Sequence, residues 1–173
     1  IMITIDGGTG KIMHNGVNIA AAPMVDQWYL TSDMTSNGDI TSLSRVSSSG
    51  SASPLATGMS ASSGVFTFPS TGKYLVMVQA TFNFAGSDNI YLSTQVSTNG
   101  GSGFTIVNYA GDANEVDSST LGGGASSNTF VDVTDVSQVK VKFSVISIGT
   151  GSTLVSDSSL TRTGFTFIRM GDT

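Results

Sequence analysis

The feature that most constrains the fold of this chain is the alternation of side chains between residues 74 and 84. Every second residue there is apolar, and together these residues line one face of a single long strand: Tyr74, Val76, Val78, Ala80, Phe82 and Phe84. A period of two is the signature of a β-strand, because successive side chains point to opposite faces of a sheet. Leu75 and Met77 lie on the second face, which is therefore also partly apolar.

The composition extends this prediction to the whole chain. Serine and threonine together number 49, glycine adds 21, and only one glutamate and four lysines are present among 173 residues. Such a mixture is poor in helix formers and rich in residues that favour strands and turns. We therefore expect an all-β chain, built as a two-sheet sandwich with a short extended N-terminal segment.

Turn signals and shorter alternating segments divide the chain. Residues 1–24 are predicted to be an extension or linker, and residues 25–173 a single domain with polar loops at 32–63 and 110–128. The Gly122–Gly124 run is predicted to be flexible loop. Large apolar side chains within the alternating segments form the predicted core: Trp28, Phe66, Phe68, Tyr74, Val76, Val78, Phe82, Val141, Phe143, Phe165 and Phe167.

The side chains needed for most catalytic and metal-binding chemistry are scarce. The chain has no cysteine, and its one histidine, His14, lies in the N-terminal extension. The net charge is −5 and the few basic residues are scattered, so we expect no nucleic-acid partner and no membrane insertion. Carboxylates that could hydrolyse glycosides, such as Asp132 and Asp135, are expected in wet loops, so we predict that the protein is not an enzyme.

Three acidic residues lie close together in the predicted polar loop at residues 110–128, and they are candidate ligands for a calcium ion. Asp112, Glu115 and Asp117 could offer carboxylate oxygens, the ligands that Ca²⁺ prefers, but their spacing matches no defined calcium loop. Ordinary solvated acids are the alternative. We therefore predict no cofactor, with calcium as the one candidate.

Two segments carry a family resemblance. Residues 64–74, Gly-Val-Phe-Thr-Phe-Pro-Ser-Thr-Gly-Lys-Tyr, resemble a segment of C1q/TNF-like jelly rolls, and residues 163–168 resemble the aromatic last strand of that fold. Together with residues 57–63 and Asp26-Gln27-Trp28, they are similar to uncharacterised C1q-like structural proteins of marine bacteriophages.

This resemblance implies a jelly roll that assembles as a homotrimer on the exterior of a virion. The implied role is an appendage module, at a tail fibre, a spike tip or a capsid decoration, joined to other virion proteins through residues 1–24. Attachment to a host would further require a glycan or a protein on the host surface as a partner. The alternative is a soluble bacterial C1q-like domain that binds carbohydrate or protein.

The residues themselves also favour association. An exposed patch of Leu75 and Met77, with Tyr91 nearby in sequence, would be unfavourable in water, so we predict these three residues at the trimer interface. Packing of the same side chains beneath the 32–63 loops of one monomer is the alternative.

Overall fold

A computed structural model describes residues 23–47, 54–116, 120–158 and 160–173, together with the backbone of three short N-terminal strands. The described residues form strands and no helix, and therefore no helix that could cross a membrane. The strands are β1 (Ile3–Ile5), β2 (Ile12–His14), β3 (Val17–Asn18), β4 (Met24–Leu30), β5 (Gly38–Asp39), β6 (Leu43–Arg45), β7 (Ser60–Ser62), β8 (Val65–Thr67), β9 (Gly72–Ala85), β10 (Asp88–Ser97), β11 (Thr105–Asn114), β12 (Thr120–Val133), β13 (Lys140–Ile146), β14 (Thr153–Leu154) and β15 (Gly164–Gly171).

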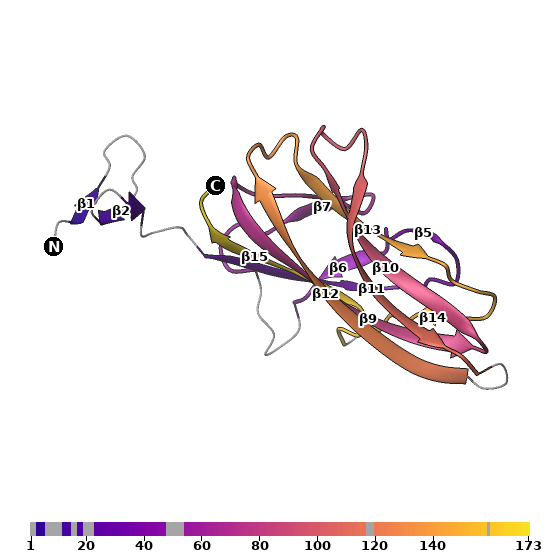
Figure 1. The fold of residues 1–173 in the computed structure, drawn as a ribbon. Helices are drawn as coiled ribbons and strands as arrows, with labels where there is room; N and C mark the ends of the chain where they lie inside the picture. Colours follow the sequence, from indigo (N-terminus) through magenta and orange to yellow (C-terminus); the bar gives the residue numbers. More distant parts are fainter. Residues whose placement is uncertain are drawn as a thin grey trace.

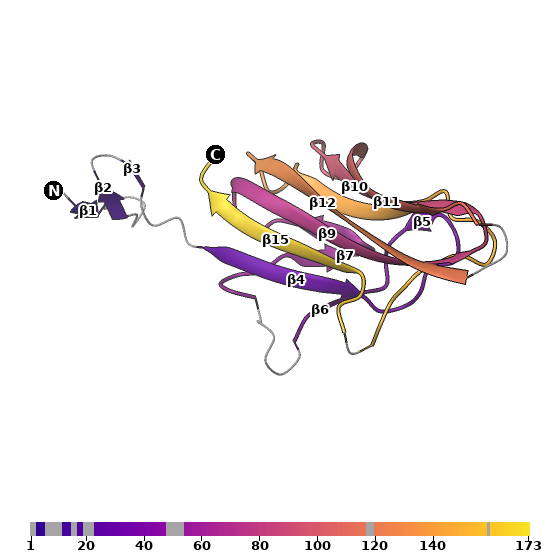
Figure 2. The same ribbon diagram turned by 60° about the horizontal axis from the view of Figure 1, so that its bottom comes forward.

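Two antiparallel sheets lie face to face (Figures 1 and 2). The first, called here the β9 sheet, has the strand order β12-β9-β15-β4-β6, with β14 paired to β9. The second, the β10 sheet, has the order β11-β10-β13-β8-β7, with β5 paired to β13. Strands that are neighbours in a sheet are mostly distant in the sequence. The architecture confirms the predicted all-β, two-sheet sandwich.

The core lies between the two sheets and consists largely of aromatic side chains. All of the predicted core residues except Trp28 are buried there. Phe143 stacks on Phe165 with ring centroids 4.2 Å apart, and Phe66 packs at 4.9 Å from Phe167. Trp28 is only partly buried, and it meets Phe66 edge-on at 5.2 Å. The inner face of β9 supplies the side chains of the alternating segment, so its predicted orientation is correct.

The predicted loop at residues 110–128 is wrong. Residues 105–114 form β11, and β12 begins at residue 120 and pairs with β9 along its whole length, from Thr120↔Ala85 to Val133↔Gly72. Gly122–Gly124 is therefore strand rather than flexible loop. Gly123 is needed because Phe84 and the Asp112 carboxylate pack against its backbone, where a Cβ atom would overlap both. Residues 32–63 hold only the short strands β5, β6 and β7 in their described part, as the loop prediction required.

The N-terminal strands β1, β2 and β3 form a separate three-stranded sheet. The sandwich itself begins at Met24, whose buried side chain belongs to the core. The assignment of residues 1–24 to an extension that joins other proteins stays a prediction. His14 lies in β2, and its side chain is outside the described part of the structure.

Candidate functional site

Five apolar side chains form a continuous row across the outward face of the β9 sheet. The strand registers place Phe130 opposite Leu75, Leu75 opposite Ile168, and Ile168 opposite Val25. An isolated bridge then places Leu55 opposite Val25. Residues directly opposite on neighbouring strands have Cβ atoms about 4.5–5.5 Å apart, so these side chains are in contact range of one another. We call them the apolar row.

The apolar row is open to water at both ends. Phe130 is 75% exposed and Leu55 is 52% exposed, whereas Val25, Leu75 and Ile168 between them are half-buried. An aromatic ring and four aliphatic side chains thus form one band rather than scattered single residues. Contiguous apolar bands of this kind on soluble proteins mark interaction surfaces.

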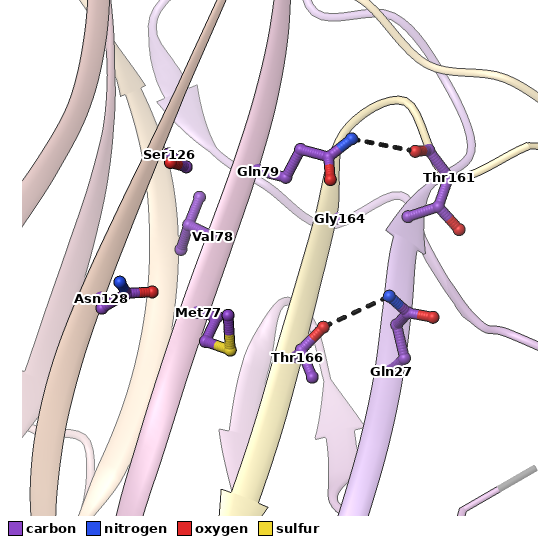
Figure 3. Close-up of a pocket in the computed structure, with 9 residues that line it drawn as sticks. All are labelled: Gln27, Met77, Val78, Gln79, Ser126, Asn128, Thr161, Gly164 and Thr166. Atoms are coloured by element: carbon purple, nitrogen blue, oxygen red, sulfur yellow. Dashed lines mark hydrogen bonds between the residues drawn. The ribbon is translucent and has the colours of Figure 1, made fainter. Parts of the chain in front are cut away.

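A shallow hollow lies next to the apolar row on the same face. Its volume is about 180 Å³, and residues of β4, β15, β9 and β12 line it (Figure 3). Met77, which is 38% exposed, stands in the next row of the sheet with Asn128, Thr166 and Gln27. The Gln27 side-chain amide donates to the Thr166 hydroxyl at 3.3 Å, and the Gln79 amide donates to the Thr161 carbonyl at 3.4 Å. No titratable residue lines this hollow, so it is a neutral, polar recess.

The edge where β11 and β12 meet is a second exposed apolar surface. Ile106 and Val107 are exposed in β11, beside a register shift in its pairing with β10. The Asn108 side chain donates to the Asn128 carbonyl at 2.7 Å and the Asp112 carboxylate accepts from the Gly124 N–H at 3.0 Å, which joins this strand to β12. The side chains of Ile106 and Val107 are exposed at this edge.

The predicted interface residues divide between two faces. Leu75 belongs to the apolar row and Met77 to the row beside it. Tyr91 lies on β10, in the other sheet, where its ring meets Tyr109 at 5.9 Å. It does not share a surface patch with Leu75 and Met77, and its place at a subunit interface stays a prediction.

A buried carboxylate that the sequence interpretation did not single out closes one side of the sandwich. The Asp26 side chain has no exposed surface, and all of its neighbours are donors. Its oxygens accept from the Arg45 Nε at 2.9 Å, the Arg45 Nη2 at 3.1 Å, the Trp28 Nε1 at 2.9 Å and the Met59 N–H at 2.7 Å. The Arg45 guanidinium also lies over the Trp28 ring, 4.7 Å from its centroid, and donates to the Met59 carbonyl. The cluster ties β4 to β6 and to the segment before β7.

Two of the three acidic candidates for calcium, Asp112 and Glu115, lie in the described part of the chain. The Asp112 carboxylate accepts a hydrogen bond from the Gly124 N–H of β12, and Glu115 is exposed. Asp117 lies outside the described residues. In the described part of the chain, no group of three or more His, Cys, Asp or Glu side chains could hold a metal ion. Calcium binding thus stays a prediction from sequence alone.

The other two carboxylates singled out from the sequence, Asp132 and Asp135, have different partners. Asp132 forms an exposed ion pair with Lys73 at 2.8 Å. Hydrogen bonds from the Ser137 side chain and backbone hold the pKa of Asp135 below its usual range. Glycoside hydrolysis requires a carboxyl group whose pKa is raised.

Comparisons with known proteins identify the fold. No family model matches the sequence, and no curated protein matches it. Among solved structures, murine APRIL at pH 5.0 superposes with a TM-score of 0.64 at 11% identity, covering 86% of this chain and 99% of that one. Eiger TNF from S. frugiperda superposes with a TM-score of 0.62 at 12% identity, covering 87% and 95%. Likeness at this level of identity establishes fold alone: the chain is a TNF-like jelly roll.

Proposed function

We propose that this chain is a non-enzymatic structural module that assembles as a homotrimer through the apolar row. The observation that carries the proposal is the continuity of the row: five apolar side chains from five separate segments meet on one exposed face. Burial of each large apolar side chain from water contributes about 1.5–3 kcal/mol. Phe130 and Leu55 are still mostly exposed, so a second copy of the chain that covers this face would gain most of its stabilisation from these two side chains and less from the three half-buried ones between them.

The two apolar surfaces fit a contact between two different patches of neighbouring subunits. The apolar row lies on a sheet face, whereas Ile106 and Val107 lie at the β11 edge, so an edge of one subunit would pack on a face of the next. Contacts between two different patches are heterologous, and they end in a closed ring only if the rotation closes. The resemblance to C1q/TNF-like jelly rolls supports three subunits.

The place of this trimer is the exterior of a bacterial virus, as an appendage or capsid decoration. This part of the proposal is supported by the resemblance of residues 57–74 and 163–173 to C1q-like structural proteins of bacteriophages. The predicted extension at residues 1–24, of which Met24 already belongs to the sandwich, would join the domain to other virion proteins. Host attachment would then follow from the surfaces that the trimer leaves exposed.

The assembly is tested by measuring the molar mass in solution by light scattering. The wild-type chain should have three times the mass of one subunit, and Leu75→Asp and Phe130→Asp should both give folded monomers. A charge cannot be buried unpaired at such an interface without losing several kcal/mol. Leu160→Asp is the matched control, because Leu160 is 64% exposed and lies outside the apolar row.

Far-ultraviolet circular dichroism confirms folding of each variant. A monomeric wild-type chain, or trimers in both Asp variants, would refute the assembly. The location is tested separately by mass spectrometry and antibody labelling of purified virions. Absence from virions, with free protein in a bacterial secretome, would refute the virion role.

A further inference from the structure

A second hollow lies on the outward face of the β10 sheet, on the other sheet from the apolar row. Its volume is about 460 Å³, and it is a shallow recess that is largely open to water. Residues from the beginning of β10 and the end of β11 line it, among them Asn89, Tyr91, Ala113 and Glu115. It therefore does not depend on the trimer interface for its walls.

Small residues on β11 make room for this hollow. The register places Asn89 opposite Ala113 and Tyr91 opposite Gly111. The Tyr91 ring lies over Gly111, where any Cβ atom would overlap it, and the edge contact with Tyr109 supports the ring from one side. More than a third of Tyr91 is still exposed, and it borders the hollow. The site thus presents an aromatic ring held in place by its neighbours.

Hydrogen-bond donors and hydrogen-bond acceptors both lie around the Tyr91 ring. The Asp88 carboxylate is held in place by the Asn89 N–H at 2.8 Å and the Gly149 N–H at 2.9 Å. The Asn89 and Glu115 side chains are exposed, and Ser87 adds a hydroxyl. The rim therefore offers amide and hydroxyl donors as well as carboxylate acceptors.

These groups select a class of ligand. No lysine or arginine lines the hollow in the described structure, while Asp88 and Glu115 are acidic, so an anion would be repelled. The apolar surface amounts to one ring and one methyl group, which is too little for a lipid chain. A metal ion would find only two carboxylates here, and the described part of the chain holds no group of three or more His, Cys, Asp or Glu side chains that could bind one.

We propose that this hollow binds a neutral saccharide. A pyranose has one face of C–H groups and a rim of hydroxyls that both donate and accept hydrogen bonds. Its C–H face would lie on the Tyr91 ring, and its hydroxyls would bond to Asn89, Glu115 and Asp88. Three such sites in a trimer would bind a repeating glycan more tightly than one site, through multivalency.

The test is saturation-transfer-difference NMR on the intact chain. The probes are neutral mono- and disaccharides of glucose, galactose, mannose and N-acetylglucosamine, with choline as the cationic comparison. We expect binding of at least one saccharide and none of choline. Tyr91→Ala removes the ring, and Ala113→Leu fills the hollow; each should weaken binding at least about tenfold, as expected for loss of a central aromatic contact.

Two variants control for folding and for the added bulk. Tyr91→Phe keeps the ring, and Thr105→Leu places the same leucine side chain at an exposed position at the other end of β11. Both should bind within about threefold of wild type. The proposal is refuted by no saccharide binding, by binding of choline instead, or by undiminished binding in Tyr91→Ala. Saccharide binding by a monomeric wild-type chain would refute the trimer and leave this site standing.

Discussion

Replacement of the buried Asp26 by asparagine should strongly destabilise the sandwich. The two side chains have nearly the same shape, so the substitution changes charge and hydrogen bonding with little change in packing. Every group that contacts the Asp26 oxygens is a donor: Arg45 through two nitrogens, Trp28 through its indole N–H, and Met59 through its backbone N–H. The asparagine NH₂ group would face donors, and the guanidinium would lose its counter-charge.

The magnitude follows from the exposure of each partner. Removal of one member of a fully buried ion pair costs about 3–5 kcal/mol. Arg45 is 35% exposed, so water can replace part of its lost interaction. An asparagine oxygen at the Oδ2 position keeps the three donors there, including the buried Met59 N–H, so its NH₂ group faces the Arg45 Nε at the Oδ1 position. A donor left without an acceptor there costs about 1–3 kcal/mol. We therefore expect Asp26→Asn to lower the free energy of unfolding by about 2–4 kcal/mol.

Urea denaturation followed by tryptophan fluorescence measures this loss, at one fixed protein concentration because association adds to apparent stability. Asp132→Asn is the matched control. Its carboxylate also lies 2.8 Å from a cation, Lys73, but both side chains are about half exposed. Exposed pairs contribute less than about 1 kcal/mol. Equal losses in the two variants, or a loss below about 1 kcal/mol in Asp26→Asn, would refute the reasoning.

Two further perturbations test the core and the β10 sheet. Phe165→Ala should lower the free energy of unfolding by about 3–5 kcal/mol, because the ring is fully buried; a loss below about 1 kcal/mol in urea denaturation would place it outside the core. Hydrogen bonds from Lys142 and Ser144 lower the pKa of Asp39. The ionised Asp39 therefore stabilises the fold at pH values above its unfolded pKa of about 4, and this stabilisation is lost as the pH falls through the lowered folded pKa. Asp39→Asn should therefore cost less than about 1 kcal/mol at pH 7, since the carboxylate is half exposed, and less again at pH 2; equal losses at both pH values would contradict this.

Alternation in the sequence was sufficient to predict the strands that carry large side chains. The inner face of β9 and the aromatic residues of β15 were assigned to the core correctly, because a half-buried strand repeats an apolar residue at every second position. Trp28 was assigned there too, and it is only partly buried because its indole N–H is bound to Asp26 at the side of the sandwich.

β12 shows where this signal fails. In its first half, small residues stand opposite the inward side chains of β9 at Gly123, Ala125 and Ser127, and Leu121, the one large apolar residue there, is 45% exposed. The strand forms because β9 offers a partner for its backbone along its whole length, and because Phe84 and Asp112 fill the space that a larger side chain would need. The stabilising contacts come from other strands, and a local pattern therefore cannot contain them.

The apolar row and the hollow beside Tyr91 also depend on which strands are neighbours, and a local sequence pattern does not contain this. Alternation shows that Leu75 and Tyr91 both point away from an inner face, but it does not show that β9 and β10 belong to different sheets. The strand order decides which side chains surround these two residues. It places Val25 and Ile168 next to Leu75, and it places Gly111 beneath Tyr91. Two side chains that the sequence suggested as one patch thus lie on separate surfaces. If the apolar row is masked by a neighbouring subunit, the Tyr91 surface is free for a ligand, and one small sandwich can assemble and bind at the same time.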